Sequence, residues 1–335
     1  MNSFDDYTIK AEKGNADAQY NLALSYDNGQ GVPQDYKQAV HWYTKASEQG
    51  LAVAQYNLAL KYDNGQGVPQ DYKQAVHWYT KAAEQSHAGA QYGLALSYAN
   101  GEGVPQDYKQ SVNWFTKAAE QDDANAQFNL GFMYRNGQGV LQDYKQAVHW
   151  YTRAAEQGDK WDQFNLGMIY DTGICVPQDY KQAVHWLTKS AEQGLANAQN
   201  FLGEMCASGR GVIEDSKQAV HWWTKAAEQG FAEAQFNLGA MNNYGNGVPQ
   251  NYKQAFHWFT KAAEQGMADA QHFLGHMHYN GQGVIKDNVE AYAWWNVASD
   301  QGDDAAIKCR DIVEEEMTAE QIAKAQALSE IYNIQ

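Results

Sequence analysis

Residues 71–85 read Asp-Tyr-Lys-Gln-Ala-Val-His-Trp-Tyr-Thr-Lys-Ala-Ala-Glu-Gln, and the segment recurs almost unchanged from Asp35 and from Asp143. These starting points are 36 residues before and 72 residues after Asp71. Eight of the 11 tryptophans share one position of this 36-residue period, and all five prolines share another. A fixed period of this length predicts a stack of identical structural modules rather than one globular core.

Each period is predicted to hold two helices. The first covers Asp17 to Asn28 and ends where Asn28-Gly29-Gln30-Gly31 supplies a left-handed cap and a tight turn. The second begins at Asp35, whose carboxylate can cap the free amides in a capping box with Gln38, and runs to about Glu48. Helical spacing places an apolar stripe of each helix toward the other, and Lys37, His41 and Lys45 on the opposite, solvent-facing side of the second helix.

Small residues occupy one internal position of every first helix. Ala23 is the first of them, and the last five repeats carry glycine there. A glycine inside a helix costs roughly 1 kcal/mol relative to alanine, so its recurrence at one position predicts close packing of the two helices.

The repeated pattern resembles the Sel1-like repeat, a relative of the tetratricopeptide repeat. It consists of a small residue, Leu-Gly or Leu-Ala, Tyr, Gly-x-Gly-Val, Asp and then Lys-x-Ala-x-x-Trp-Tyr-x-Lys-Ala-Ala-x-x-Gly. The resemblance implies an all-α fold, a right-handed α/α superhelix in which the first helices line the concave face and bind proteins. Residues 14–301 then form eight helix–turn–helix repeats, with helical caps at 1–13 and 302–335. The pattern is broken at Lys160-Trp161-Asp162, Cys175, Cys206 and Ser216, so we expect the repeat geometry to be irregular there.

Composition narrows the classes of partner. The formal net charge of −16 argues against nucleic acid, whose binding depends on basic stripes. No stretch approaches the ~20 apolar residues of a membrane span, and the first residues lack the features of a signal peptide. These features predict a cytoplasmic protein, or a periplasmic or secreted one if a leader has been removed. Cys175, Cys206 and Cys309 are expected to be unpaired and buried; the disulfide-rich members of the family, with their β-lactam-related activity, are therefore a poor guide to this chain.

The histidines allow a metal interpretation. His41 and its equivalents recur once per repeat, roughly 20 Å apart by helix packing, which is too far for one ion. Asp269, His272 and His276 are spaced three and four residues apart on one helical face, with His278 nearby, and could hold zinc or nickel. They define an alternative function, a metal-binding protein or metal-dependent enzyme.

The main prediction is a binding surface on the first helices. No nucleophile–base pair, phosphate loop or dinucleotide fingerprint stands out, so we predict no enzymatic activity and no cofactor. The positions opposite the core stripe carry a row of aromatic residues and a row of asparagines, which can bond the backbone of an extended peptide or bridge neighbouring helices. The aromatic row comprises Tyr20, Tyr56, Tyr92, Phe128, Phe164 and Phe236, and the asparagine row comprises Asn21, Asn57, Asn129, Asn165 and Asn237.

The fourth and fifth repeats are predicted to hold the strongest part of this surface. An aromatic cluster there resembles an interface hot spot, although Trp161 could instead fill a gap in the irregular fifth repeat. The cluster consists of Phe128, Phe132, Trp161, Phe164 and Met168, with Arg135 and Asp171 at its edge. We therefore expect a monomeric adaptor that binds a protein or peptide segment of unknown identity in its groove, without nucleic acid or membrane insertion.

Overall fold

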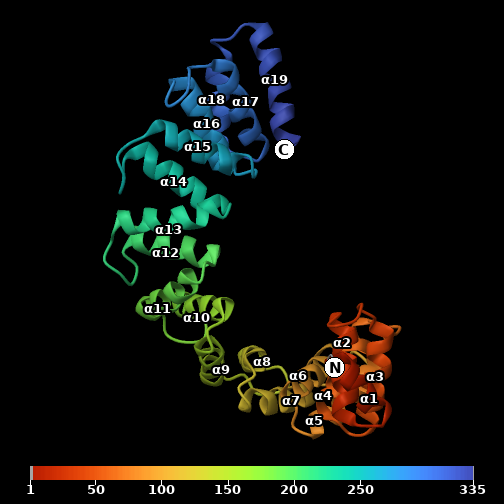
Figure 1. The fold of residues 1–335 in the computed structure, drawn as a ribbon. Helices are drawn as coiled ribbons and strands as arrows, with labels where there is room; N and C mark the ends of the chain where they lie inside the picture. Colours follow the sequence, from red (N-terminus) through yellow and green to blue (C-terminus); the bar gives the residue numbers. More distant parts are fainter. Residues whose placement is uncertain (1–2, 335) are drawn as a thin grey trace. The chain divides into compact units, whose positions relative to one another are not determined.

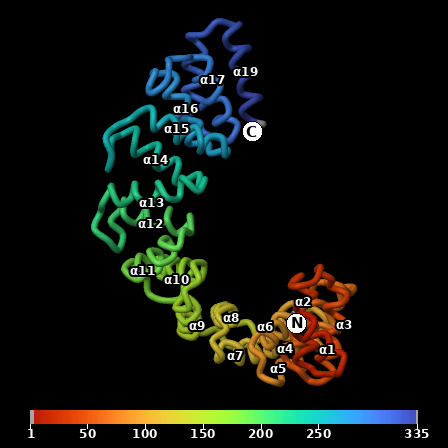
Figure 2. The backbone as a smooth tube through the Cα atoms, viewed as in Figure 1, coloured from red at the N-terminus to blue at the C-terminus, as the bar shows by residue number. Residues whose placement is uncertain are grey.

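The computed structural model describes residues 3–334, and all regular secondary structure in this range is helical. Figure 1 shows the helices as a series of antiparallel pairs, and Figure 2 traces the same succession of hairpins along the backbone. The prediction of an α/α solenoid built from eight repeats of about 36 residues is thus confirmed.

The first helix of each pair is called helix A. Helix A comprises α2 (Ala16–Asn28), α4 (Ala52–Asn64), α6 (Ala88–Asn100), α8 (Ala124–Asn136), α10 (Lys160–Thr172), α12 (Ala196–Ser208), α14 (Ala232–Tyr244) and α16 (Ala268–Asn280). The second helix of each pair is called helix B. Helix B comprises α3 (Tyr36–Glu48), α5 (Tyr72–Glu84), α7 (Tyr108–Glu120), α9 (Tyr144–Glu156), α11 (Tyr180–Glu192), α13 (Ser216–Glu228), α15 (Tyr252–Ala263) and α17 (Asn288–Asp300).

Further helices lie beyond the repeats, namely α1 (Ser3–Glu12), α18 (Asp304–Glu314) and α19 (Ala319–Ile334). Thr318 and Gln321 form a reciprocal capping box before α19, because each backbone amide donates to the side chain of the other residue. The chain divides into two compact units, one ending at Asp162 and the other beginning at Gln163. The boundary falls inside α10, in the repeat whose sequence departs most from the pattern.

The ends of the repeat helices follow local chemistry. Asp35 Oδ1 accepts hydrogen bonds from the amides of Lys37 and Gln38 at the start of α3. At the end of α2, Gly29 has φ +68° and its amide donates to Ser25. Both observations match the caps expected from the sequence.

The core of each unit is a layer between helices A and B. A row of fully buried leucines on helix A, including Leu58 and Leu94, faces a buried aromatic or leucine side chain on helix B, such as Tyr43 or Phe115. Beside this residue helix A carries alanine or glycine, and the fit is tight: a Cβ on Gly203 would lie 2.7 Å from the Trp223 ring. The expected close approach of the helices at this position is therefore confirmed.

Successive repeats are joined by buried glutamines that the sequence analysis did not single out. Gln55 donates its amide to the Ser47 carbonyl of the preceding helix B at 3.0 Å and accepts from Gln85 Nε2 at 2.8 Å. The same side-chain pair recurs in all eight repeats, as Gln49–Gln19, Gln85–Gln55, Gln121–Gln91, Gln157–Gln127, Gln193–Gln163, Gln229–Gln199, Gln265–Gln235 and Gln301–Gln271. We call this series the glutamine ladder. It satisfies polar groups that stacking would otherwise bury unpaired.

One repeat junction also contains a buried charge. Lys61 is 7% exposed, and its Nζ lies 2.5 Å from Asp27 Oδ1 of the preceding repeat. Gln66 Oε1 accepts from the same ammonium at 3.0 Å, and the Tyr43 hydroxyl donates to the other Asp27 oxygen at 3.1 Å. Burial, with the Asp27 charge beside it, raises the pKa of Tyr43 well above its usual value, so this hydroxyl stays protonated.

Candidate functional site

The aromatic row lies on helix A as expected, but its rings are half-buried. Each packs against a neighbouring aromatic ring, which belongs to the buried core in every case but that of Phe164, whose partner Phe201 is half-buried. The ring centres of Phe128 and Tyr151 are 5.2 Å apart, and those of Phe236 and Phe259 are 5.6 Å apart. These contacts give the row a packing function within repeats and, at Phe164 and Phe236, between neighbouring repeats.

The asparagine row is also partly engaged. The amides of Asn21, Asn57 and Asn129 donate to carbonyls one turn earlier in their own helices, at 2.8–2.9 Å. Burial raises the pKa of Tyr20, and a hydrogen bond from Asn57 in the next repeat opposes this rise; Asn129 acts in the same way on Tyr92. For these two asparagines the structure favours the bridging interpretation. Two further members, Asn165 and Asn237, are half-buried on α10 and α14.

The predicted cluster of the fourth and fifth repeats is divided between the two units. In the second unit, Phe164 and Met168 pack against the buried core, and Phe164 lies 5.9 Å from the Phe201 ring. Asp171 is buried and forms an ion pair with Arg210 at 3.5 Å. The prediction placed Asp171 at the edge of a binding surface. Its carboxylate instead joins two repeats, because a buried charge requires a partner of opposite sign.

The first unit contains a pocket lined in part by two of the predicted residues. A cavity of about 270 Å³ lies between α6 and α8, with Asn129 and Phe132 in its wall. Phe132 is 44% exposed, which is unusual for a phenylalanine within a repeat. The other lining residues are Leu96, Ala99, Asn100, Tyr108, Phe115, Met133 and Gln138. Aromatic walls with a few amides match the composition of a recognition pocket.

Two more predicted residues of the first unit lie outside this pocket. Trp161 is 50% exposed in the first turn of α10, and its backbone amide donates to Asp159 Oδ1 at 2.7 Å. Arg135 is half-buried near the end of α8, and its carbonyl accepts from Gln142. Trp161 thus remains a large apolar side chain accessible to a partner.

Asp162, beside Trp161, occupies a position that is a buried alanine in the other repeats, such as Ala126. Burial, with Asp159 nearby, raises the pKa of Asp162 from 3.8 to about 6. A raised carboxyl pKa contributes stability below about pH 4, and this contribution is lost as the pH rises through 6.

We therefore expect Asp162→Asn to raise the melting temperature at pH 7.5 by a few degrees, because the side chain is partly screened by water. The gain should shrink steadily toward pH 4, whereas the exposed Asp17→Asn should have no such effect. Thermal melts of both variants across this pH range provide the measurement. An equal gain at pH 7.5 and pH 4 would contradict the expectation.

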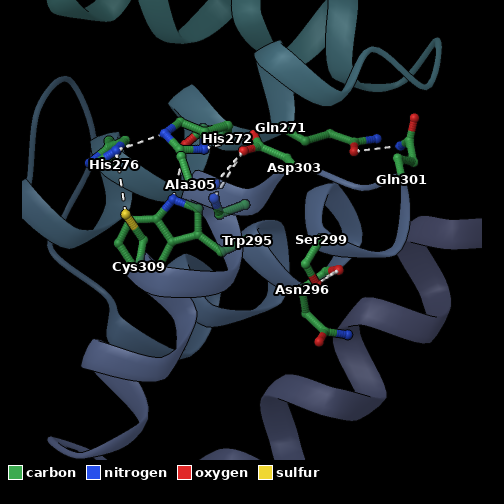
Figure 3. A network of polar contacts seen from close by, with 11 residues as sticks. Gln271, His272, His276, Trp295, Asn296, Ser299, Gln301, Asp303, Ala305 and Cys309 are labelled. Carbon is green, nitrogen blue, oxygen red and sulfur yellow. Dashed lines mark hydrogen bonds and ion pairs between the residues drawn. The ribbon is translucent and has the colours of Figure 1, made fainter.

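The histidines behave in two ways. His41 and the equivalent side chains on other helices B are exposed beside tryptophan rings, as expected. In the last repeat, Figure 3 shows His272, His276 and Cys309 gathered in one place. The two Nε2 atoms are 2.9 Å apart, and Cys309 Sγ lies 3.8 Å from His276 Nε2.

The carboxylate of this group is not the expected one. Asp269 is exposed and lies outside the cluster found among the described residues. Asp303 Oδ2 instead lies 2.9 Å from His272 Nδ1, while Asp303 Oδ1 caps α18 by accepting from Ala305 and Ala306. His278 lies apart from the cluster, with its ring 5.4 Å from Phe256. Cys309 also differs from the prediction: Cys175 and Cys206 are buried apolar residues, but Cys309 is half-buried and faces an imidazole.

Protonation in the cluster follows from burial and charge. Burial, together with His272, lowers the pKa of His276, so its ring is neutral near pH 7. Burial raises the pKa of the Cys309 thiol, and the Asp303 charge adds to this rise. Burial alone would raise the pKa of Asp303, but the amides of its helix cap and His272 lower it overall. The group therefore combines two imidazoles, a thiol and an ionised carboxylate.

Two solved structures resemble the whole chain. One is c5321, described as a protective antigen of uropathogenic Escherichia coli with an SLR fold; it is 34% identical over 98% of this chain and 86% of its own, with a TM-score of 0.65. The other is a Sel1 repeat protein of Oxalobacter formigenes, 34% identical over 91% of this chain and 89% of its own, with a TM-score of 0.68. Among curated proteins, no significant match was found. Within residues 3–334, no helix combines the length and apolar character needed to cross a bilayer.

The family profile matches the repeats one by one. The Sel1 repeat aligns with residues 16–51, 52–87, 88–123, 124–159, 162–195, 196–231, 232–267 and 268–303. The fifth match begins two residues late, at the irregular segment that contains Trp161. Sel1 repeat proteins are generally scaffolds for protein interaction. The chain belongs to the Sel1 repeat family, with eight repeats in a tetratricopeptide-like α/α solenoid.

Proposed function

We propose that this protein is a non-enzymatic scaffold that binds an extended peptide or protein segment across helix A of its third and fourth repeats. The observation that carries the proposal is the pocket between α6 and α8, where an exposed Phe132 stands beside Asn129. Its volume of about 270 Å³ is below the range of small-molecule sites, roughly 300–1,000 Å³. A single apolar side chain of a peptide fits this size better than a complete metabolite.

The chemistry of the pocket supports the same ligand. Leu96, Phe115 and Met133 offer apolar contacts, and Asn129, whose amide nitrogen donates to the Asn125 carbonyl, offers its side-chain oxygen as an acceptor for a peptide amide. A backbone hydrogen bond contributes about 0.5–1.5 kcal/mol, whereas removal of a buried aromatic anchor can cost more than about 2 kcal/mol. Phe132 should therefore dominate binding, with Trp161 as a second anchor in the same unit.

We use peptides that are selected for binding to the full chain as probes. We expect Phe132→Ala to weaken their binding more than tenfold, and Asn129→Ala to weaken it by a smaller factor. Trp161→Ala should also weaken binding more than tenfold for those peptides that reach the first turn of α10. Peptides selected from a random display library against the immobilised full chain serve as probes, and fluorescence anisotropy measures their dissociation constants.

Two control variants distinguish binding at this pocket from non-specific binding to apolar or exposed surfaces. Leu141→Ala removes an apolar side chain that is 90% exposed in a loop outside the pocket, and His149→Ala changes the exposed face of helix B. Both variants should bind as the unmodified protein does. If His149→Ala abolished binding while Phe132→Ala and Asn129→Ala left it intact, the binding surface would be helix B and the proposal would fail.

A further inference from the structure

The last repeat departs from the others at two positions of helix A. His272 stands where earlier repeats carry the aromatic row, and His276 stands at the position of Phe132. In the other repeats neither position carries histidine. Both departures occur together, one helical turn apart, and they face Cys309 on the next helix but one (Figure 3).

We propose that His272, His276 and Cys309 bind one zinc ion, which joins the last repeat to α18. Two imidazoles and a thiolate are established ligand types for Zn²⁺, and a fourth position taken by water completes its tetrahedral preference. This inference concerns the C-terminal end of the second unit and is independent of the pocket between α6 and α8.

The geometry fits a tetrahedral ion. Zinc–nitrogen bonds of about 2.0–2.1 Å and a zinc–sulfur bond of about 2.3 Å place neighbouring ligand atoms roughly 3.3–3.6 Å apart. The observed separations are 2.9 Å between the two Nε2 atoms and 3.8 Å between His276 Nε2 and Cys309 Sγ. All three ligand atoms lie within 4.8 Å of one another. Small side-chain rotations therefore suffice to place an ion between them.

The surroundings orient the ligands. The ionised Asp303 carboxylate can only accept hydrogen bonds, so the nearby His272 Nδ1 carries the ring proton, and His272 Nε2 presents its lone pair toward His276. Asp303 is itself fixed by the Ala305 and Ala306 amides. A carboxylate behind a ligating imidazole is the usual outer arrangement of a zinc site.

The repeat framework also holds His272 from its backbone. The buried Trp295 donates its indole N–H to the His272 carbonyl at 3.2 Å, and its ring meets His276 edge-on at 5.2 Å. Cys309 approaches from α18, so the three ligands come from two helices, α16 and α18. An ion here acts as a cross-link between these helices.

Binding requires a defined exchange of protons. Without metal, a single proton lies between the two facing Nε2 atoms, because two lone pairs at 2.9 Å would repel each other. On binding, the His276 proton moves to its Nδ1 through solvent, and the Cys309 thiol releases its proton to water. The zinc ion then occupies the position between the nitrogens and the sulfur, without any redox change.

The test uses the full chain without a histidine tag, reduced and freed of metal by a chelator. Competition with a chromophoric chelator measures zinc affinity and stoichiometry, and cobalt(II) serves as a spectroscopic probe. We expect one zinc per chain, a thiolate-to-cobalt charge-transfer band, and a higher melting temperature with zinc. Cys309→Ser and His276→Gln should each lower the affinity at least about 100-fold, and Asp303→Asn, which preserves the helix cap, about 10–100-fold.

Matched controls decide between this site and adventitious binding. His257→Ala removes an exposed imidazole of the same unit, and Cys206→Ala removes a buried thiol; neither should change the affinity. The proposal is overturned if the protein binds no stoichiometric zinc, if Cys309→Ser binds as tightly as the original, or if the cobalt protein lacks the thiolate band. The cobalt spectrum of the unmodified chain decides the matter even if one variant fails to fold.

Discussion

Asp27→Ala should lower the free energy of unfolding of the first unit by about 3–5 kcal/mol, because it leaves the Lys61 ammonium buried without its counter-ion. Lys61 is 7% exposed, and its remaining neighbours, Gln66 and the Tyr36 ring, do not carry a negative charge. The variant also removes the acceptor of the Tyr43 hydroxyl. Denaturant unfolding followed by helical circular dichroism measures the loss.

The neighbouring repeat supplies the control. Asp63 accepts from Tyr79 just as Asp27 accepts from Tyr43, but the residue equivalent to Lys61 in the next repeat is Ser97. Asp63→Ala should therefore cost only about 1 kcal/mol, the value of an ordinary hydrogen bond. Adding Lys61→Ser to Asp27→Ala should recover most of the loss. If the double variant is as unstable as Asp27→Ala alone, the buried charge is not the cause.

Gly103→Ala should destabilise the first unit by about 3 kcal/mol. Its φ of +73° already costs a side chain about 1–2 kcal/mol. A Cβ here would also lie 2.9 Å from the Lys73 amide nitrogen, and nearer still to the Tyr72 carbonyl of the preceding repeat. These are backbone atoms at the start of α5, so they cannot rotate away as a side chain would.

Gly101 isolates the two contributions. It lies in the same turn with φ +77°, but its added Cβ would meet Gln106 no closer than 3.3 Å. Gly101→Ala should thus show only the conformational cost, about 1–2 kcal/mol, in the same denaturant experiment. Equal losses for the two variants would mean that the approach of neighbouring repeats at Gly103 adds nothing.

The repeat fold could be predicted because the same pattern of caps, turns and apolar positions recurs every 36 residues. The caps at Asp35 and Gly29 use side chains and backbone angles that are readable from neighbouring residues alone. The glutamine ladder was not predicted, because Gln19 and Gln49 are 30 residues apart and look like ordinary polar residues of helices. Only the folded structure reveals that Gln19 is buried and accepts a hydrogen bond from the exposed Gln49.

The candidate sites were predicted in part for a related reason. Helical spacing correctly paired His272 with His276, but the remaining groups came from outside the helix, namely Asp303 at a repeat junction and Cys309 on α18. Spacing along one helix carries no information about such contacts. Similarly, the face of helix A that can receive a ligand also touches the next repeat, so residues such as Asn57 and Asp171 serve the stack. Phe132 and Asn129 line a pocket that only the structure could reveal, and their part in binding stays a prediction.

Because of the glutamine ladder, one repeat can follow another in the stack without a change in the contacts between them. At the repeat junctions within each unit, a glutamine amide on helix A donates to the same carbonyl of the preceding helix B, so the repeats that meet there have matching ends. Duplication or deletion of one 36-residue segment between equivalent glutamines would restore the identical bond across the new joint. A gene encoding such a chain can therefore gain or lose whole repeats by unequal recombination, and the protein with the new number of repeats still stacks. The surface residues of each repeat can meanwhile change independently of those in the other repeats.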